Sequence, residues 1–251
     1  MSGTTAPANR LLVVTAVAAE RDAAAAGLAA VLPPGAVTTD APDPATAPDP
    51  GPAPALIATV LAGGVGPGAA ASATATALAR AEAAGQPYDL VLSAGIAGGF
   101  APTAPVGSVA VASAITAADL GAQTPDGFVP VAELGFGTSR HLPPPELSRA
   151  VADGLAAAYG PVLTVSTVTG SAERAAELAG RHPGAVAEAM EGFGVAEAAA
   201  AAGLPVLEIR TVSNAVGPRD RAAWRIGEAL AALTAAFGKL PAVLGVEAHH
   251  G

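Results

Sequence analysis

Acidic and amide side chains follow two apolar runs of this sequence, at points where a buried strand would end. Glu20 comes after Leu11–Ala16, and Asn214 comes after Val206–Val212. A carboxylate in such a loop can deprotonate a water molecule as a general base, and an amide can bind a ligand through a donor and an acceptor. From position alone, helix capping is the stronger interpretation of Glu20, and turn formation is sufficient for Asn214.

A second acidic residue, Glu191, follows Met190 at the start of a stretch that is otherwise apolar (AMEGFGVAEAA, residues 189–199). A lone glutamate at the start of an apolar helix usually caps that helix in contact with solvent. The order of the three polar residues along the chain, rather than any one position, makes them candidates for a common site.

Two glycine-rich segments also adjoin expected strands, Ala62–Gly68 (AGGVGPG) and Ser93–Phe100 (SAGIAGGF). Their backbone can approach a sugar or line a flat pocket, although tight turns alone would also require the glycines. The first segment fails the spacing of a dinucleotide-binding fingerprint, and no lysine follows it as in a P-loop. The candidate ligand contacts in the two segments are Gly64, Ala94, Gly95, Ala97 and Gly98.

The elements that must position these residues are predicted by short apolar runs that alternate with Ala-rich stretches. The expected strands are Leu11–Ala16, Leu56–Leu61, Leu90–Ala94, Val109–Ile115, Val162–Val168 and Val206–Val212. The expected helices are Arg21–Val31, Ala69–Ala84, Pro145–Tyr159, Glu173–Gly180, Glu191–Ala202 and Arg221–Leu240. Alternation of this kind predicts an α/β fold with a largely parallel sheet covered by helices on both faces. Ligands of such folds bind at the carboxyl ends of the strands.

The composition favours a single α/β domain that binds a small molecule. The length of 251 residues suits one domain, and 51% hydrophobic but only 3% aromatic residues means that Ala, Val and Leu build the core. A net charge of -9 argues against a nucleic-acid partner. The absence of cysteine excludes disulfides and thiolate chemistry and is consistent with a cytoplasmic protein. Pro33–Pro54 lacks apolar periodicity, so we expect a flexible surface insertion there.

We expect no membrane partner, although the mean hydropathy is +0.48. A spanning helix needs about 18 consecutive apolar residues, and the candidate run Gly194–Ile209 is interrupted by Glu197, Pro205 and Glu208. The start of the chain, Arg10 followed by the apolar run Leu11–Ala19, has the pattern of a signal peptide. A buried first strand explains the same run, and we favour that interpretation.

From TAVAAERD (residues 15–22) to the last expected helix, the sequence resembles the nucleoside phosphorylase and nucleosidase superfamily. The most specific feature is the motif Met190–Gly192, followed one strand later by Ser213-Asn214. The resemblance covers nearly the whole chain apart from the Pro-rich segment and the tail. It implies a three-layer α/β/α fold with a central mixed, largely parallel sheet, a purine nucleoside as substrate and a homo-oligomer. We expect no cofactor, and no metal because His141 and His182 have no partners at metal spacing.

The resemblance also implies roles for individual residues. Glu20 occupies the position of the residue that activates the attacking water, Glu191 that of the acceptor for the ribose hydroxyls, and Met190 packs on the sugar. Adenine-specific nucleosidases carry an aspartate where Asn214 stands, and an amide has no titratable proton to give to the base. Its NH2 group can instead donate to N7 and O6 of hypoxanthine. Glu173 is a candidate acceptor for N1–H, and the alternative is a position on the solvated face of a helix.

Within the superfamily, residues 93–100 and 213–224 are most similar to the member that hydrolyses a hypoxanthine nucleoside in an alternative menaquinone pathway. Water is the expected nucleophile, because the two glycine-rich segments contain no Arg or Lys to bind phosphate. Ile96 departs from the serine that nucleosidases often carry near this water. That substrate ends in an aryl carboxylate, for which the candidate partners are the cations Arg140, Arg219 and Arg221 and the aromatic residues Phe128 and Phe136.

Other functions remain open at this stage. A methylthioadenosine or adenosylhomocysteine nucleosidase and a purine nucleoside phosphorylase would share the fold. A nucleoside-binding sensor would share the site without turnover, and the intact pair of Glu20 and Glu191 favours an enzyme over it. A periplasmic binding protein would require the signal-like start to be removed.

Overall fold

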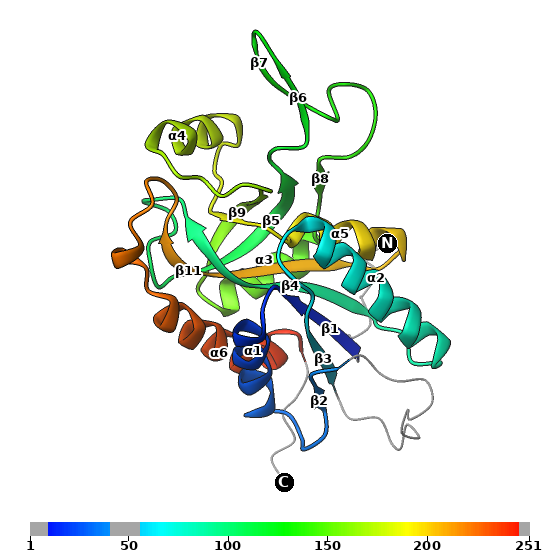
Figure 1. The fold of residues 1–251 in the computed structure, drawn as a ribbon. Helices are drawn as coiled ribbons and strands as arrows, with labels where there is room; N and C mark the ends of the chain where they lie inside the picture. Colours follow the sequence, from blue (N-terminus) through cyan, green and yellow to red (C-terminus); the bar gives the residue numbers. More distant parts are fainter. Residues whose placement is uncertain (1–9, 41–55, 246–251) are drawn as a thin grey trace.

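The computed structural model describes residues 10–40 and 56–245. Its central sheet contains β1 (Arg10–Thr15), β2 (Val37–Thr38), β3 (Ile57–Ala62), β4 (Leu90–Gly99), β5 (Val109–Ala117), β8 (Arg140–His141), β9 (Ala158–Thr164), β10 (Ala187–Ala189) and β11 (Val206–Ala215). The strand order is β10-β9-β5-β11-β4-β1-β3-β2, with β8 paired to β5 (Figure 1). Six of the pairings are parallel and three are antiparallel. The expected mixed, largely parallel sheet is thus confirmed.

Part of the sheet closes on itself, because β10 is paired both with β9 and with β4. The pairings therefore form a ring of β4, β11, β5, β9 and β10. Side chains of a strand alternate between its two faces, and β1 illustrates the consequence. Leu11 and Val13 pack in one apolar core, whereas Leu12 and Val14 pack in the other.

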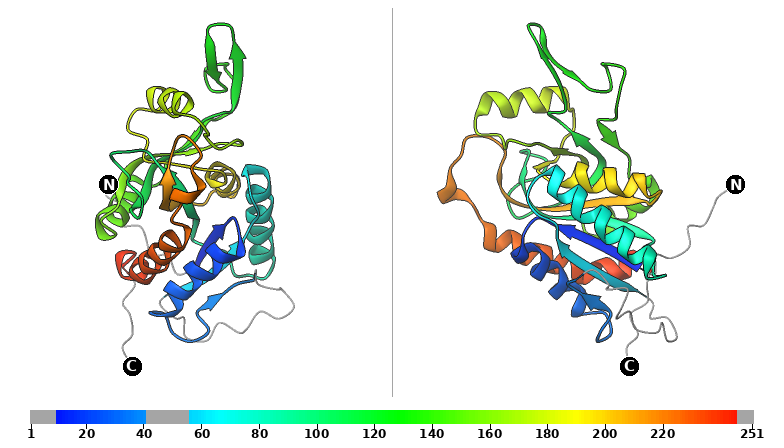
Figure 2. Two further views of the ribbon diagram at one scale, coloured as in Figure 1. Left: turned by 60° about the vertical axis from the view of Figure 1, so that its left-hand side comes forward. Right: turned by 45° about the vertical axis from the view of Figure 1, so that its right-hand side comes forward.

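Helices cover both faces of the sheet, which gives the three layers that were expected. Helices α1 (Ala18–Ala29), α3 (Pro145–Gly154) and α6 (Ile226–Val243) pack on one core. Helices α2 (Pro67–Ala83) and α5 (Gly192–Ala201) pack on the other, on the opposite side of the sheet (Figure 2). Close packing of α1 against α6 depends on Gly27, since a Cβ there would lie 2.3 Å from the carbonyl oxygen of Thr234.

Two elements lie outside these layers. Helix α4 (Ala172–Arg181) packs through Leu178 on a small separate cluster. The hairpin of β6 (Gly121–Thr124) and β7 (Gly127–Pro130) forms its own two-stranded sheet and projects from the body (Figure 1).

Several boundaries differ from the expected ones. Strands β4 and β11 continue through Gly99 and Ala215, because these glycine-rich and polar ends pair with each other. The expected helix Pro145–Tyr159 ends at Gly154, since Ala156 adopts a positive φ of 51° and β9 starts soon after. Strand β10 and the β6–β7 hairpin were not expected.

The expected flexible insertion, Pro33–Pro54, starts too early. Val37–Thr38 pair with β3 as β2, and Ala36 is buried and accepts a backbone hydrogen bond from Ala58. Residues 41–54 of the expected insertion lie outside the described residues. The signal-like run at the start contains β1, which is buried in the sheet.

The segment Arg221–Val243 is long and apolar enough to cross a membrane by length and composition. The sequence analysis did not single it out. It contains the short 3-10 turn η1 (Arg221–Ala223) and α6, and one side of α6 is buried against the sheet and α1 through Leu233, Phe237 and Leu240.

Candidate active site

A cavity of about 280 Å3 opens where the carboxyl ends of β1, β4 and β11 meet strand β10. Four of the residues that line it have little or no side chain, Ala97, Gly98, Ala189 and Ala215. Its walls carry the polar residues that the sequence pointed to, since Glu20, Glu191 and Asn214 all line it. Three segments that are far apart in the chain therefore contribute to a single cavity.

Glu20 is held rigidly at the first turn of α1. Its Oε2 accepts the backbone N–H groups of Ala16 at 3.0 Å and Val17 at 3.2 Å, and its Oε1 accepts that of Ile96 at 2.9 Å. The side chain is only 4% exposed. Glu20 therefore caps the helix and lines the cavity at once, so the two interpretations of the sequence were not alternatives. A carboxylate oxygen can accept more than one hydrogen bond, which leaves Oε1 able to bind a water.

Glu191 lies where β10 leads into α5. Its Oε1 accepts the N–H of Gly66 at 3.2 Å, and its Oε2 accepts that of Met190 at 3.3 Å. The helix that follows is anchored by Thr164, whose hydroxyl oxygen accepts the N–H of Phe193 at 2.9 Å. The glycine-rich segment after β3 thus helps to orient this carboxylate.

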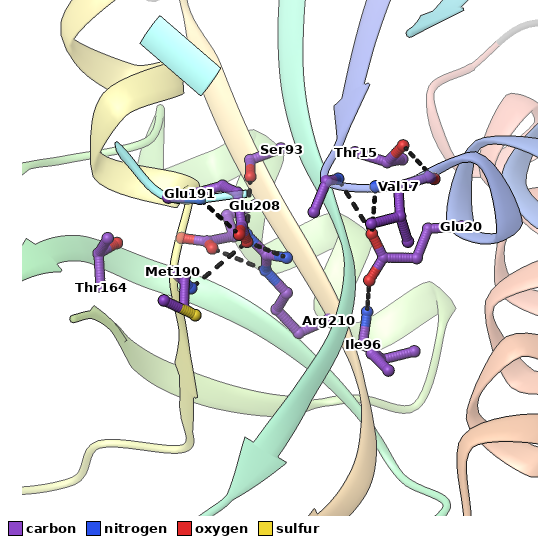
Figure 3. A network of polar contacts seen from close by, with 12 residues as sticks. Thr15, Val17, Glu20, Ser93, Ile96, Thr164, Met190, Glu191, Glu208 and Arg210 are labelled. Atoms are coloured by element: carbon purple, nitrogen blue, oxygen red, sulfur yellow. Dashed lines mark hydrogen bonds and ion pairs between the residues drawn. The ribbon is translucent and has the colours of Figure 1, made fainter. Parts of the chain in front are cut away.

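A fully buried guanidinium, that of Arg210 in β11, lies beneath these carboxylates (Figure 3). Its Nε donates to Glu208 at 2.9 Å, its Nη2 donates to the Ser93 hydroxyl at 3.0 Å, and its Nη1 lies 3.4 Å from Glu191 Oε2. Burial by itself would lower the pKa of Arg210, but the charges of Glu208, Glu191 and Glu20 raise it above its ordinary value. Arg210 therefore stays cationic and links the carboxylate network.

Two glycines leave the space that this network needs. A Cβ at Gly95 would lie 2.7 Å from Glu20 Oε1 and 2.8 Å from Arg210 Nη1. A Cβ at Gly192 would lie 2.2 Å from Glu208 Oε1. Gly192 of the Met-Glu-Gly motif is thus required by the buried ion pair beside it.

Asn214 also lines the cavity, at a register shift of β11 between Val212 and Asn214. The hydroxyl of Ser213 donates to Asn214 Oδ1 at 2.8 Å, and Nδ2 donates to the carbonyl of Ala215 at 3.0 Å. These contacts fix the amide plane. An NH2 group has two N–H donors, so one remains for a ligand.

The cavity also receives Glu188, which the sequence analysis did not select. Its side chain is 6% exposed, and its carboxylate accepts the backbone N–H of Thr169 at 2.8 Å and the Thr169 hydroxyl. The carboxylate thus lies in a defined orientation beside the ligand space.

The other predicted site residues divide into two groups. Met190, Ala97, Gly98 and Arg219 line the cavity. Gly64, Ala94 and Gly95 do not, because Ala94 packs in the core and Gly95 lies behind Glu20 and Arg210.

The structure does not bring Glu173 into the cavity. Glu173 is in the exposed first turn of α4, where hydrogen bonds from its own backbone N–H and from the Ser171 hydroxyl lower its pKa. It lies in the first turn of a helix that Ser171 caps, which corrects the expected contact with the base.

Phe128 is also outside the cavity, because the β6–β7 hairpin projects away from the sheet. Its ring centre lies 4.3 Å from the guanidinium carbon of Arg181, in a separate pocket that Arg140 also lines. Arg221 is exposed in η1, and Phe136 is 65% exposed. Of the residues considered for the aryl carboxylate, Arg219 lines the cavity, together with Trp224, whose ring centre lies 5.4 Å from the Arg219 guanidinium carbon.

Sequence reasoning missed Arg210, Glu188 and Trp224. A signal for Arg210 was present, because Glu208 and Arg210 stand two residues apart in an apolar run and so share one face of a strand. Opposite charges on one face of a buried strand indicate an internal ion pair. No comparable pattern marks Glu188, which lies between alanines in a strand of three residues.

Comparison with known proteins places this geometry in a family. A model described as the phosphorylase superfamily matches residues 55–243. The chain is 63% identical to the futalosine hydrolase of Streptomyces coelicolor over 93% of this chain and 96% of that protein. It is 46% identical to the futalosine hydrolase of Acidothermus cellulolyticus over 92% of this chain and 90% of that protein.

Among solved structures, the fold is similar to that of a 5′-methylthioadenosine/S-adenosylhomocysteine nucleosidase from Neisseria meningitidis in complex with methylthio-immucillin-A. The TM-score is 0.69 at 21% identity, over 94% of this chain and 98% of that chain. This likeness supports the architecture described above.

Proposed function

Since the chain belongs to the phosphorylase superfamily and, within it, to the futalosine hydrolases, we propose that it hydrolyses the N-glycosidic bond of futalosine. The products are hypoxanthine and dehypoxanthine futalosine, in menaquinone biosynthesis. The observation that carries the proposal is the shared cavity of Glu20, Glu191 and Asn214.

Glu20 acts on the water. As the bond between the anomeric carbon and the purine nitrogen breaks, positive charge develops on the ribose ring, as in other glycoside hydrolyses. Water attacks the anomeric carbon and gives one proton to the Glu20 carboxylate, which the N–H groups of Ala16, Val17 and Ile96 hold in place. Glu20 is thus the general base of the reaction.

Glu191 and Met190 hold the sugar. The Glu191 carboxylate accepts hydrogen bonds from the ribose hydroxyls, a charge-assisted contact, and Met190 packs on the ring. Arg210 and the Gly66 N–H keep Glu191 in one orientation. Arg210 is therefore a positioning residue for the acceptor of the ribose.

Asn214 binds the leaving base. The electron pair of the broken bond moves onto the purine, and the free N–H of Asn214 Nδ2 donates to N7 and stabilises that charge; the released base then takes up a proton from solvent. An amide cannot protonate N7, so this site suits hypoxanthine, whose O6 and N7 both accept hydrogen bonds. The aspartate that adenine-specific nucleosidases carry at this position can instead protonate N7.

Water rather than phosphate is the nucleophile. The cation nearest the reacting carboxylates, Arg210, is fully buried and already paired with Glu208 and Glu191. A phosphate dianion needs an available cationic partner. We assign Arg219 and Trp224, at the outer end of the cavity, to the aryl carboxylate of futalosine.

The test is to incubate the purified protein with futalosine, inosine and methylthioadenosine, with and without phosphate, and to follow base release by chromatography. We expect hypoxanthine from futalosine at the same rate in both buffers. Base release from methylthioadenosine alone would contradict the assignment of Asn214, and a phosphate-dependent sugar 1-phosphate would make the protein a phosphorylase.

We further propose that the chain forms one domain, acts in the cytoplasm and assembles as a homo-oligomer. A projecting β6–β7 hairpin is consistent with an element that contacts a second subunit. Light scattering coupled to size-exclusion chromatography measures the molar mass, and a mass equal to the 23.9 kDa of one chain would contradict the oligomer.

A further inference from the structure

Glu188 and Asn214 face the cavity from two strands that flank the same residue. In the antiparallel pair of β10 and β4, Glu188 is opposite Gly98. In the parallel pair of β11 and β4, Asn214 is also opposite Gly98. Neighbouring strands lie about 4.8 Å apart, so roughly two strand spacings separate the two backbones. Gly98 places no side chain between them, and a flat ring can lie over it.

Glu188 has no cationic partner among the described residues, although its carboxylate is almost completely buried. Burial of an unpaired carboxylate is costly unless hydrogen bonds compensate it. Thr169 supplies two such bonds, and a carboxylate can accept about four. Each oxygen therefore accepts one hydrogen bond from Thr169 and keeps acceptor capacity that a donor on a ligand in the cavity can use.

Hypoxanthine has a suitable donor at N1, and a 6-aminopurine has no donor at that position. Its N1 carries a hydrogen, next to the acceptor O6, whereas N1 of adenine is an acceptor next to an amino donor. A carboxylate beside N1 therefore gains a charge-assisted hydrogen bond from hypoxanthine. Beside adenine, two acceptors face each other and both remain unsatisfied.

We propose that the Glu188 carboxylate accepts the N1–H of the purine and thereby selects 6-oxopurine nucleosides against 6-aminopurine nucleosides. This inference rests on the proposed hydrolysis of futalosine and assigns to Glu188 the contact that the sequence had suggested for Glu173. Thr169 positions the carboxylate, and Asn214 binds N7 from the opposite side. The base is therefore recognised at both ends.

The decisive variant is Glu188→Gln, because it keeps the shape of the side chain and adds an N–H donor. That donor can satisfy N1 of an adenine base. Values of kcat/KM are measured for futalosine and for its 6-amino analogue, with the wild-type protein, Glu188→Gln and Glu173→Gln. Glu173→Gln is the matched control, since it makes the same change at an exposed carboxylate outside the cavity.

We expect Glu188→Gln to lower kcat/KM for futalosine by about 10- to 100-fold and to shift the ratio of the two substrates toward the 6-amino analogue by at least about tenfold. Glu173→Gln should leave both values within about twofold. Equal losses for both substrates in Glu188→Gln, or no loss, would overturn the inference. A wild-type protein that does not hydrolyse futalosine would refute the proposed function itself, which is a separate outcome.

A second measurement needs no variant. Calorimetric titration of the wild-type protein compares hypoxanthine with 1-methylhypoxanthine, which has a methyl group in place of the N1 hydrogen. At least about tenfold weaker binding of the methylated base is expected. Equal affinities would exclude a hydrogen bond from N1–H, whatever the folding of the Glu188 variant.

Discussion

At the scale of single residues, the site depends on charges that are buried together. Burial raises the pKa of Glu208, while Arg210 acts in the opposite direction. Glu208 Oε1 accepts a hydrogen bond from Arg210, and the hydroxyl of Ser93 accepts another from the same guanidinium. Because Arg210 has no contact with solvent, its orientation is set by these partners alone. Of the carboxylates that line the cavity, Glu191 is in turn oriented by Arg210.

Glu208→Gln removes an anionic partner of Arg210 without changing the volume of the side chain. A hydrogen bond to a charged group is worth more than one between neutral groups, so we expect the free energy of unfolding to fall by about 1–3 kcal/mol. Activity on futalosine should fall as well, because Glu191 is oriented by Arg210. Urea denaturation and steady-state kinetics measure the two effects.

The matched control is Glu197→Gln, which removes the half-exposed partner of His141 on α5. An exposed ion pair contributes less than about 1 kcal/mol. If both variants lost equal stability, the special role of the Arg210 network would be refuted.

Glu20→Gln tests the general base directly. We expect kcat on futalosine to fall by about 10²- to 10⁴-fold, because a carboxamide cannot take a proton from water. Binding of hypoxanthine, measured by calorimetry, should change little. Asp22→Asn on the exposed side of the same helix is the control, and its kcat should equal that of the wild type. A Glu20→Gln variant with normal turnover would remove Glu20 from the mechanism.

At the scale of elements, local sequence patterns predicted most strands and helices but not where β4 and β11 end. Glycine and polar residues weaken a strand signal, so the expected strands stopped at Ala94 and Val212. In the fold, the two ends pair with each other as far as Gly99 and Ala215. Tertiary pairing, which no local pattern contains, thus brings together cavity-lining residues at the ends of these two strands.

Strand β10 was missed for the same reason. Its three residues, Ala187–Ala189, have no periodicity to detect, and they become a strand because β9 and β4 supply hydrogen-bond partners on both sides. No pattern in the sequence therefore indicated Glu188 as a site residue. By contrast, Glu20, Glu191 and Asn214 stand at ends of elements with a clear apolar pattern, and their order along the chain and the resemblance to nucleosidases identified them as site residues.

The contact between α1 and α6 gives a test at this scale. Gly27→Ala would place a Cβ 2.3 Å from the Thr234 carbonyl oxygen and 2.9 Å from Phe237 Cβ. We expect overpacking to lower the free energy of unfolding by about 1–3 kcal/mol, with KM for futalosine unchanged. The measurement is urea denaturation.

Gly180→Ala in α4 is the control, because a Cβ there meets no atom within 4 Å. Alanine is the better helix former, so this variant should be as stable as the wild type or more stable by up to about 1 kcal/mol. Equal destabilisation of both variants would show that the close approach of α1 and α6 is not the cause.

At the scale of the whole molecule, the protein has a local cationic region although its net charge is -9. His182 is half-buried near Arg181, Arg174 and Arg140. Its pKa is lowered by burial first and by the three arginines next. The composition argued against a nucleic-acid partner but did not predict this region, which forms where α4, β8 and the residues after α4 meet.

The lowered pKa of His182 gives a prediction for stability against pH. The unfolded chain titrates its histidine near pH 6.5, and the folded protein does so at a lower pH. Between the two values the unfolded state binds more protons, so this group causes stability to be lost as the pH falls below about 6.5. His182→Gln should therefore reduce the loss of unfolding free energy between about pH 7.5 and 5.5, as measured by urea denaturation. An unchanged slope would contradict the prediction.

The small residues that line the cavity limit how the substrate preference of this enzyme can change by mutation. Ala97, Gly98, Ala189 and Ala215 line the cavity with little or no side chain, so every substitution there other than alanine to glycine adds atoms and shrinks the space for a base. New substrate preferences must therefore arise from exchanges in the walls, at Glu188, Asn214 or Trp224, where one side chain can replace another without loss of room. Engineering the protein toward other nucleosides should begin with libraries at those three positions.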